Sequence, residues 1–533
     1  MKRFSLKLFL TGVCALVSVL TVQAEVVDAT TARSIALEFI QSRGLGEAGV
    51  SSHAIKLALK NPAYYVFNID SNGGWVIVAG EDRFQPVLGY SKTGTFDPEN
   101  MPENQRAWHN GYSRQLEYVS QHSEIPSFTP VLRTSDRENV EPILVTKWHQ
   151  SSPYNKYCPN HTVGCTITAT TQVMYYYQWP QDSIPEIPGY STYNDQSFPS
   201  LPATKFDWDL MLPEYKAGEY TTENSDAVAI LSHYVGKSFQ AWYSSTYTIA
   251  SFPNAVRALL KYYDYDPSAN YVLRNNYVYE TWEEMLYQEI LQHRPVVYSG
   301  VQEQSFIGHA FVFDGYEDGY YHVNWGSGGN GEYVTLDACP GDYGYNYDQD
   351  MIMNIKPNEG GVHPYNVNTM SILTPLSTSV NADINVRAMI NTYVYPYLYH
   401  TQLGAVAKNS GELVFIDQDI NDRYTGGYDT LSISLPTGFP EGLYELKVLI
   451  NRSQDATEGT WEEGVRGDAL PRLQMIVAGN YVKLGLVAPT EPDLALSIDD
   501  VTWIIDALLA GDETLSIDDV TTVIDVLLFK SIN

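Results

Sequence analysis

The spacing of apolar residues predicts a small α+β unit near the start of the chain, from residue 25 to about 139. A helical pattern stops at Gly44, and two strand-like runs flank a Ser-Asn-Gly sequence that is typical of a hairpin turn. The predicted elements are helices over 30–43 and 105–119 and strands over 64–69 and 74–80. The polar segment 120–139 contains Pro126 and Pro130, so we expect an exposed linker there.

A second pattern runs from residue 140 to about 358. Apolar residues recur one helical turn apart from residue 165 onward, and Pro180 cannot continue a helix, so a helix is predicted to end just before it. The runs 308–315 and 320–326 are strand-like and are separated by Glu-Asp-Gly. We expect these two runs to pair as a hairpin.

The remaining chain divides into two further parts. Short alternating runs with turn residues between them fill 359–487, which is the pattern of an antiparallel β-sandwich. In the tail, 488–533, the seven residues 496–502 recur as 515–521, and a helical pattern follows each copy. Two copies are too few for a solenoid, so we expect a helical hairpin whose Asp-Asp pairs cap the helices.

Composition narrows the class of protein. A chain of 533 residues is too long for one core, and about three to five domains are expected. Its 41 Tyr and 10 Trp argue against disorder. The formal net charge of -31 argues against nucleic acid or an anionic membrane as a partner. Such a charge is ordinary for a soluble protein that works outside the cell.

Residues 1–24 have the parts of a secretory signal: a basic start, an apolar run and a small-residue cleavage site. The apolar run is too short to span a bilayer, so we expect a secreted or extracytoplasmic protein. Without the signal, three cysteines remain, an odd number. Either Cys158 and Cys339 form a disulfide and Cys165 is free, or all three stay reduced.

Cys165 stands in the first turn of the predicted helix, directly after Gly164. Free backbone N–H groups and the positive end of the helix dipole favour a thiolate at this position, which is how a cysteine nucleophile becomes reactive. The alternative is a small buried hydrophobic residue, which is the usual role of a free cysteine. The rest of the chain has to decide between them.

A nucleophilic cysteine needs a base, and the base needs an orienting group. His309 opens the first strand of the predicted hairpin and Asn324 ends the second, so the amide oxygen can fix the imidazole tautomer, with Trp325 as a cover. The order Cys, His, Asn and an interval of roughly 140 residues from Cys165 to His309 are typical of papain-like proteases. The Cys165 N–H and the Gln150 side chain are candidate oxyanion donors. Each residue alone is more often structural, and their conjunction favours catalysis.

Four motifs occur in that order: Trp-x-Gln-x-x-Pro-Tyr-Asn, Gly-Cys-x-x-Thr-Ala, Gly-His-Ala-Phe-Val-x-Asp-Gly and His-Val-Asn-Trp-Gly. With them the chain resembles the streptopain family of secreted bacterial cysteine peptidases, which have a papain-like fold. The segments 74–83 and 87–91 are similar to the inhibitory prosegment of that family. The resemblance implies an inhibitory prodomain with its linker over 25–139 and a papain-like peptidase domain over 140–358. Together with the β-sandwich over 359–487 and the helical tail over 488–533, we expect an α+β chain of four parts.

The resemblance also implies catalytic roles for five residues: Cys165 as nucleophile, His309 as general base and acid, Gln150 in the oxyanion hole, and Asn324 and Trp325 as the support of His309. Two positions depart from the family pattern. Ser327 stands where a second Trp is usual, which changes the wall of the site. Ile167 replaces a usual small residue in the helix, which we interpret as a packing change.

The tail resembles the repeated segments of dockerin modules. A calcium loop that ends at Asp500 or Asp519 lacks most ligands and the glycine at its sixth position, so strong calcium binding is not expected. A cohesin-like or cell-surface partner is one interpretation of the tail, and a plain helical hairpin is the other. Zinc at Cys158, His161 and Cys165 would lack a fourth ligand and block the nucleophile, so we expect no metal and no cofactor.

These observations predict a secreted zymogen of a cysteine endopeptidase that hydrolyses peptide bonds through a thiolate. Its expected partners are protein or peptide substrates and its own prodomain, which acts as an intramolecular inhibitor. We expect a monomer. Maturation is expected by a cut between Ser120 and Glu141. Two alternatives remain: another papain-fold amide hydrolase or transglutaminase, and an inactive surface adhesion protein.

Overall fold

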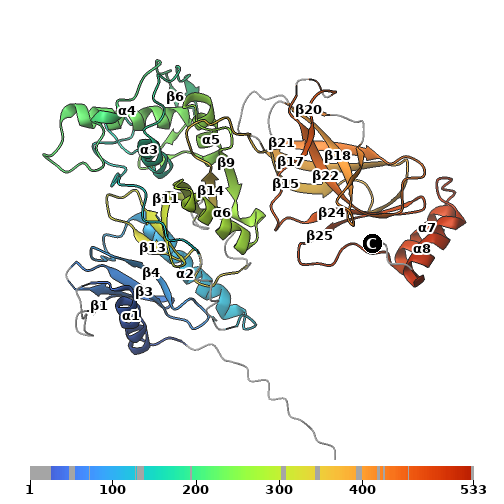
Figure 1. Cartoon of the computed structure of the whole chain (residues 1–533), viewed down its shortest axis with the longest axis horizontal. Helices are drawn as coiled ribbons and strands as arrows, with labels where there is room; N and C mark the ends of the chain where they lie inside the picture. Colours follow the sequence, from blue (N-terminus) through green and yellow to red (C-terminus); the bar gives the residue numbers. More distant parts are fainter. Residues whose placement is uncertain are drawn as a thin grey trace, which may run out of the picture.

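The computed structural model arranges the chain as three units in a row, with a helical pair at the end of the third (Figure 1). The predicted signal, residues 1–24, lies outside the described residues. The structure describes residues 26–46, 55–70, 72–126, 128, 137–192, 195–301, 308–341, 349–391, 399–416, 421–423, 427–453, 455 and 457–529.

The N-terminal unit has the helices and the hairpin that the sequence predicts. Gly44 ends the first helix with a φ of 62°, a left-handed conformation that favours glycine. The hairpin strands pair antiparallel across the Ser-Asn-Gly turn. The elements are α1 (Ala29–Arg43), β1 (Ile55–Lys60), β2 (Tyr64–Ile69), β3 (Trp75–Ala79), β4 (Val87–Ser91) and α2 (Glu103–Gln121).

One sheet of ten strands runs through both the N-terminal unit and the central unit. The two units join where β4 pairs antiparallel with β13, so that Tyr90 lies opposite Tyr333. The strand order is β1-β2-β3-β4-β13-β12-β11-β10-β14-β9. The central strands are β9 (Asn270–Leu273), β10 (Val296–Val301), β11 (Gly308–Glu317), β12 (Tyr320–Asn324), β13 (Glu332–Val334) and β14 (Gln349–Met353).

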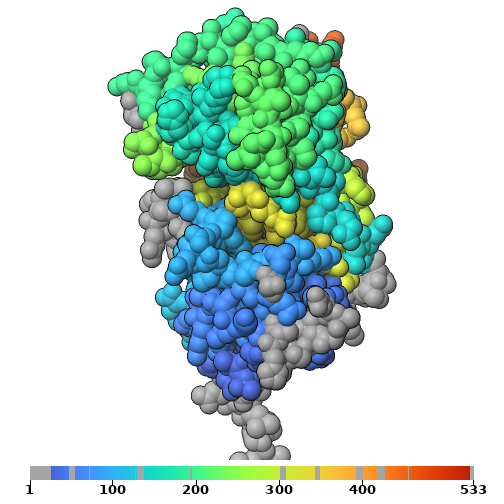
Figure 2. Space-filling view, turned by 90° about the vertical axis from the view of Figure 1, so that its left-hand side faces the viewer, coloured from blue at the N-terminus to red at the C-terminus, as the bar shows by residue number. Residues whose placement is uncertain are grey.

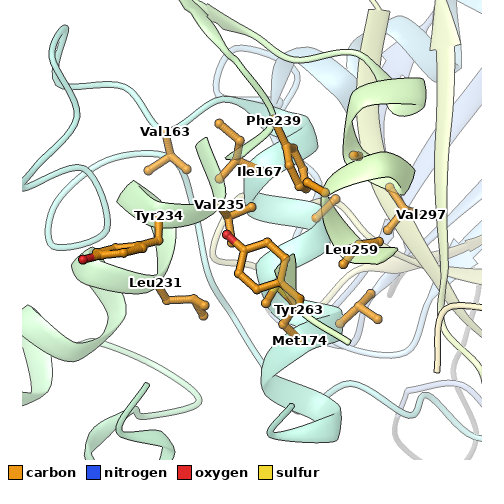
Figure 3. Close-up of a cluster of buried hydrophobic side chains, with 14 of the residues drawn as sticks. Val163, Ile167, Met174, Leu231, Tyr234, Val235, Phe239, Leu259, Tyr263 and Val297 are labelled. Carbon is orange, nitrogen blue, oxygen red and sulfur yellow. The ribbon is translucent and has the colours of Figure 1, made fainter. Parts of the chain in front are cut away.

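Helices cover both faces of the central strands. Alternate residues of β11 enter different cores, as the two-residue period of a strand requires: Ala310 and Val312 pack with α3, and Phe311 and Phe313 pack with α2 and α6. Figure 3 shows the first core, where α3 and the neighbouring helices meet Val297 of β10. The other central elements are α3 (Cys165–Tyr177), α4 (Thr222–Ser238), α5 (Phe252–Tyr262), α6 (Tyr279–Leu291), η1 (Trp208–Leu210), η2 (Arg274–Asn276), and the short pairs β5 (Tyr190–Ser191) with β6 (Ser197–Phe198) and β7 (Trp242–Tyr243) with β8 (Thr248–Ile249).

The C-terminal unit is the predicted sandwich of antiparallel sheets, which share one apolar core. One sheet has the order β15-β17-β21, and the other β16-β25-β24-β22-β18-β19 with β20 and β23 at its sides. Its elements are β15 (Asn366–Ile372), β16 (Ser377–Ser379), β17 (Asp383–Asn391), β18 (Tyr399–Ala407), β19 (Leu413–Ile416), β20 (Asn421–Arg423), β21 (Gly427–Ser434), β22 (Gly442–Asn451), β23 (Trp461–Glu463), β24 (Arg472–Ala478), β25 (Tyr481–Val487), α7 (Ile498–Leu509) and α8 (Ile517–Phe529).

The tail helices pack on this sandwich through two buried carboxylates. Asp500 accepts a hydrogen bond from the Ser497 N–H at the start of α7 (2.6 Å) and another from the Tyr481 hydroxyl (2.6 Å). Asp519 is its repeat at the start of α8, and it accepts from the Asn480 N–H of the sandwich (2.6 Å). The predicted capping by Asp is thus confirmed, and the same carboxylates fasten the tail to the sandwich.

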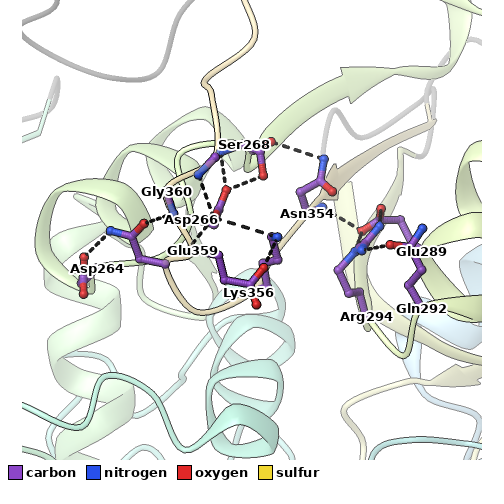
Figure 4. Close-up of polar contacts among 12 residues, drawn as sticks. Asp264, Asp266, Ser268, Glu289, Gln292, Arg294, Asn354, Lys356, Glu359 and Gly360 are labelled. Atoms are coloured by element: carbon purple, nitrogen blue, oxygen red, sulfur yellow. Dashed lines mark hydrogen bonds and ion pairs between the residues drawn. The ribbon is translucent and has the colours of Figure 1, made fainter.

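A buried carboxylate organises the segment that leaves the central unit. Asp266 is fully buried and accepts hydrogen bonds from Ser268 and from the backbone N–H groups of Glu359 and Gly361 (Figure 4). Burial opposes ionisation, but these hydrogen bonds outweigh it and lower the pKa of Asp266 to about 2. This carboxylate therefore holds the exit of the chain toward the C-terminal unit.

The structure differs from the expected exposed linker over 120–139 and from the alternative with a Cys158–Cys339 disulfide. Part of the predicted exposed linker is anchored, because Ile125 is buried and Arg137 pairs with Glu283 (2.9 Å); residues 127 and 129–136 lie outside the described residues. Cys158, Cys165 and Cys339 are all free thiols, so the disulfide between the first and the last does not form. Among the described helices, none is both long and apolar enough to cross a bilayer.

Candidate active site

Cys165 is the first residue of α3, as the sequence predicts. The preceding Gly164 has a φ of 96°, and a Cβ on it would lie 2.9 Å from the Thr248 carbonyl oxygen. A side chain at residue 164 would therefore strain the turn and collide with backbone. Thr166 fastens the start of the helix to the same loop, since its hydroxyl donates to the Ala250 carbonyl (3.0 Å). Cys165 is thereby held at the mouth of a cavity.

The cavity has a volume of about 710 Å³ and brings together three of the predicted catalytic residues: Cys165, His309 and Gln150. It lies between the helices α3 and α5 and the ends of β10, β11 and β14. Figure 2 shows the helical part of the central unit above and the N-terminal unit below, with the yellow strand region of the central unit between them. The N-terminal unit enters this cavity, because Glu103 and Asn104 at the start of α2 line it.

Cys165 and His309 are both neutral in this arrangement. Burial raises the pKa of the Cys165 thiol above its ordinary value of 9.0, although hydrogen bonds from Ala310 and Thr166 oppose the rise. Burial also lowers the pKa of His309 below 6.5, opposed by the charge of Glu103. Within the described part of the chain, no hydrogen bond or ion pair joins the two side chains, and the Cys165 sulfur contacts the Gly308 carbonyl instead (3.8 Å). The site is therefore assembled but not ionised.

Asn324 takes a different place from the one expected on the hairpin. β11 and β12 pair as predicted, but Asn324 lies opposite Val312, and His309 lies opposite Gly300 of β10. The Asn324 amide N–H donates to the Thr146 carbonyl (2.8 Å), and its oxygen accepts from the Gly326 N–H (3.0 Å). Among the described residues, no hydrogen bond joins Asn324 to the imidazole, since the strand pairing does not set the two residues opposite each other.

Trp325 is buried and joins the active-site region to the N-terminal unit. Its ring packs against Phe311 of β11, with centroids 4.9 Å apart, and against Trp108 of α2, 6.5 Å apart. The buried Asn104 amide donates a hydrogen bond to the Trp325 carbonyl. Trp325, the residue predicted to shield His309, therefore contacts both β11 and α2.

The two positions that depart from the family motifs, Ile167 and Ser327, lie in different surroundings. Ile167 is buried in the core, and the absence of a side chain at Gly236 on α4 makes room for it, since a Cβ there would lie 3.1 Å from the end of Ile167. This burial is consistent with the interpretation of Ile167 as a packing residue, which stays a prediction. Ser327, in place of a second Trp, lines the cavity, so the wall at this point is small and polar.

Sequence reasoning missed three residues of the cavity. Glu103 and Asn104 follow Pro102 at the start of a predicted helix, and a helix start with polar residues is too common to identify a blocking element. Asp350 also lines the cavity, from β14. Its only signal is one charge in an otherwise apolar strand, Gln-Asp-Met-Ile-Met.

The cavity combines a thiol at the start of a helix, a histidine on the adjoining sheet and the start of a helix from the N-terminal unit. This combination is that of a papain-like cysteine peptidase in its zymogen form. Comparison with known families agrees. Residues 148–333 match the peptidase C10 family, and residues 24–116 match the Spi protease inhibitor family. Streptopain of Streptococcus pyogenes is 30% identical over 370 residues, which cover 61% of this chain and 91% of streptopain. The chain belongs to the peptidase C10 family.

Other similar proteins extend over different shares of the chain. The thiol protease/hemagglutinin PrtT of Porphyromonas gingivalis is 28% identical over 491 residues, 83% of this chain, which spans about half (53%) of the length of PrtT. Among solved structures, prointerpain A of Prevotella intermedia is 27% identical and is covered over 99% of its fragment and 57% of this chain, with a TM-score of 0.49. Active interpain A of the same organism is 28% identical over 99% of its chain and 43% of this one, with a TM-score of 0.38.

Proposed function

We propose that this chain is the zymogen of an exported cysteine endopeptidase whose nucleophile is Cys165 and whose general base is His309. The observation that carries the proposal is one cavity lined by Cys165, His309 and Gln150 and entered by the start of α2. A peptidase site and its inhibitor segment are thus built from the same chain. The residue roles are inferred from that geometry and from the family motifs.

In the proposed mechanism, His309 takes the proton of Cys165, and the thiolate attacks the scissile carbonyl. The developing oxyanion accepts hydrogen bonds from the Cys165 backbone N–H and the Gln150 side chain. His309 then protonates the leaving amine, and water activated by the same imidazole hydrolyses the acyl-enzyme. Asn324 and Trp325 act as positioning residues for His309, and we infer that the imidazole approaches Asn324 only after the N-terminal unit has left.

Inhibition follows from what α2 brings into the cavity. Asn104 and Glu103 occupy space next to the nucleophile, and burial under α2 keeps Cys165 protonated. A tethered blocker has an effective concentration of about millimolar, so a modest intrinsic affinity suffices. We infer that a cut between Ser120 and Glu141 ends the tether and that the mature enzyme starts near Asn139.

Export and the role of the tail are further parts of the proposal. Export rests on the signal pattern of residues 1–24. For the dockerin-like tail we favour an intramolecular role over a cohesin-like or cell-surface partner. Asp500 and Asp519, the last ligands of any calcium loop there, already accept hydrogen bonds from backbone and from the sandwich. A carboxylate used in this way is a poor calcium ligand.

The test compares the wild type with Cys165→Ala and with Cys158→Ala, which removes a buried thiol outside the cavity. Under reducing conditions, the wild type and Cys158→Ala should shorten to a form that starts near Asn139 and degrade denatured casein, whereas Cys165→Ala should stay at full length. An epoxysuccinyl inhibitor should label Cys165 in the shortened wild type, read by mass spectrometry.

Adding the active wild type to Cys165→Ala should restore the cut, which shows that the variant is folded and cleavable. Cleavage of casein by Cys165→Ala at the wild-type rate would contradict the assignment of the nucleophile. Incorporation of an amine into casein without cleavage would identify a transglutaminase instead.

A further inference from the structure

Asp350 on β14 is aligned across the sheet with Ala310 on β11, two strands away. Ala310 of β11 is the direct partner of Ser299 on β10, and Ser299 is the direct partner of Asp350 on β14. Directly paired residues present their side chains on the same face of a sheet. All three line the cavity of Cys165. Neighbouring strands lie about 4.8 Å apart, so the Asp350 backbone is roughly 10 Å from that of Ala310.

Asp350 is half-buried, and its carboxylate has only part of the hydrogen bonding that a charge withdrawn from water needs. Its Oδ2 accepts from the Tyr271 hydroxyl (2.8 Å). Its Oδ1 is hidden from water and has no hydrogen-bond partner among the described residues. Burial raises the pKa of Asp350 to about 6, although hydrogen bonds from Tyr271 and Ser299 oppose the rise. At neutral pH the group is therefore a poorly compensated anion.

No cation in the described cavity balances this anion. The other titratable groups that line the cavity are Glu103 of α2, His149, Cys165 of α3, Tyr247, His309 of β11 and Tyr271 of β9. Burial lowers the pKa of both histidines, so neither carries a charge at neutral pH, and Glu103 adds a second negative charge. A buried charge without a partner is costly, and such groups gather at functional sites.

We propose that Asp350 is the base of a substrate subsite that binds the lysine or arginine side chain of a peptide close to the scissile bond. The inference rests on the proposed peptidase function and adds the specificity-determining residue. The extended side chain of Lys or Arg is about 6 to 7 Å long, so it can reach across most of the roughly 10 Å between the strands of Ala310 and Asp350. Tyr271 orients the carboxylate by its hydrogen bond, and Oδ1 is left for the substrate cation.

The experiment measures kcat/KM of the processed enzyme on matched fluorogenic peptides that carry Lys or Gln at one position at a time, on either side of the cut. The wild type should prefer Lys over Gln at one position by about tenfold to a hundredfold, the range of a charge-assisted hydrogen bond. Asp350→Asn should bring that ratio close to one, and Asp350→Glu should retain a preference for Lys. Asp209→Asn, an exposed carboxylate outside the cavity, is the matched control and should keep the wild-type ratio.

A second measurement needs no variant. As the pH is lowered from about 7.5 to about 5, the Lys-to-Gln ratio of the wild type should fall, because Asp350 gains a proton in that range. Cleavage of the Gln peptide serves as the reference, because it reports the titration of Cys165 and His309 alone. A ratio near one in the wild type, or a ratio that Asp350→Asn leaves unchanged, overturns the subsite. If the wild type cleaves no peptide and Cys165 takes no inhibitor label, the peptidase function itself fails and the subsite with it.

Discussion

The N-terminal and C-terminal units both lie against the central unit, but only the first reaches the chemistry. The N-terminal unit continues the central sheet through β4 and β13 and shares an apolar core with it through Trp108 and its neighbours. The C-terminal unit has a core of its own and meets the central unit through polar contacts: Asn276 with Asn368 (3.0 Å), and Asp468 with the Val278 N–H (2.8 Å).

The difference teaches how far each unit can be separated from the enzyme. An interface of apolar side chains and strand pairing behaves like the interior of one domain, so after the cut has ended the tether the N-terminal unit must still dissociate or be degraded before the site is free. A polar interface between separate cores resembles a transient contact between proteins. The N-terminal unit therefore reaches the site directly, whereas no described residue of the C-terminal unit lines the cavity.

The largest expected effect comes from removing the N-terminal unit. In the zymogen burial raises the pKa of the Cys165 thiol above its ordinary value, so the thiol stays protonated at pH 6. In papain-like sites the paired thiol ionises several pH units lower. Alkylation of Cys165 by iodoacetamide at pH 6 should therefore accelerate by about a hundredfold once the N-terminal unit has dissociated, even though a less basic thiolate is a weaker nucleophile.

The control is the form that lacks 488–533 and keeps the N-terminal unit, which should alkylate at the zymogen rate. Peptide mapping assigns the modified cysteine. Equal rates in the zymogen and the dissociated enzyme across the whole pH range would refute the idea that α2 holds the thiol neutral.

The second prediction addresses the exit toward the C-terminal unit. The pKa of Asp266 is about 2 in the folded chain against an ordinary 3.8, so the ionised group stabilises the fold by about 2 kcal/mol. Because the folded pKa is depressed, this stability is fully present above pH 4 and is lost as the pH falls toward 2. Asp266→Asn should lower the free energy of unfolding of the central unit by that amount at pH 7, measured by urea denaturation.

Asp264→Asn is the matched control, because Asp264 is exposed and its carboxylate accepts a hydrogen bond from the exposed Asn358 amide of the same loop (2.7 Å). It should change the free energy of unfolding by less than about 0.5 kcal/mol. If Asp266→Asn matches this control at pH 7, or if its deficit persists undiminished at pH 2, the hydrogen-bonded carboxylate is not what stabilises the exit.

The smallest effect is expected from the tail. Deleting 488–533 should change kcat/KM of the processed enzyme less than about twofold, because the tail touches only the sandwich. Titration calorimetry of the full-length protein with calcium should show no micromolar site, since Asp500 and Asp519 are already engaged. Micromolar calcium uptake that disappears with the tail would contradict this interpretation.

Local structure could be predicted from the sequence because its causes are local. Apolar spacing and Gly44 predicted α1, and Gly-Cys followed by helical spacing predicted α3 with the nucleophile at its start. The hairpin of β11 and β12 followed from two strand patterns and a turn. The roles of Cys165 and His309 stay predictions, supported by their common cavity.

Relations between distant residues could not be predicted in the same way. The register that sets Asn324 opposite Val312 depends on a bulge near Phe313, and strand periodicity alone does not determine a shift of one residue. The entry of Glu103 into the cavity depends on how α2 packs on the sheet. Asp350 joins the site through pairing across two strands, so its meaning appears only with the sheet order.

The pairing of β4 with β13 also decides what the mature enzyme looks like at its border. Once the N-terminal unit departs, the row of N–H and C=O groups that faced β4 becomes an open sheet margin. Such margins recruit strands from other molecules and start aggregates. Here the margin is only Glu332–Val334, three residues long, and it contains a carboxylate. Natural edge strands are protected against aggregation by being short and by carrying charge. The edge exposed by activation has both properties, so activation need not cause the enzyme to aggregate.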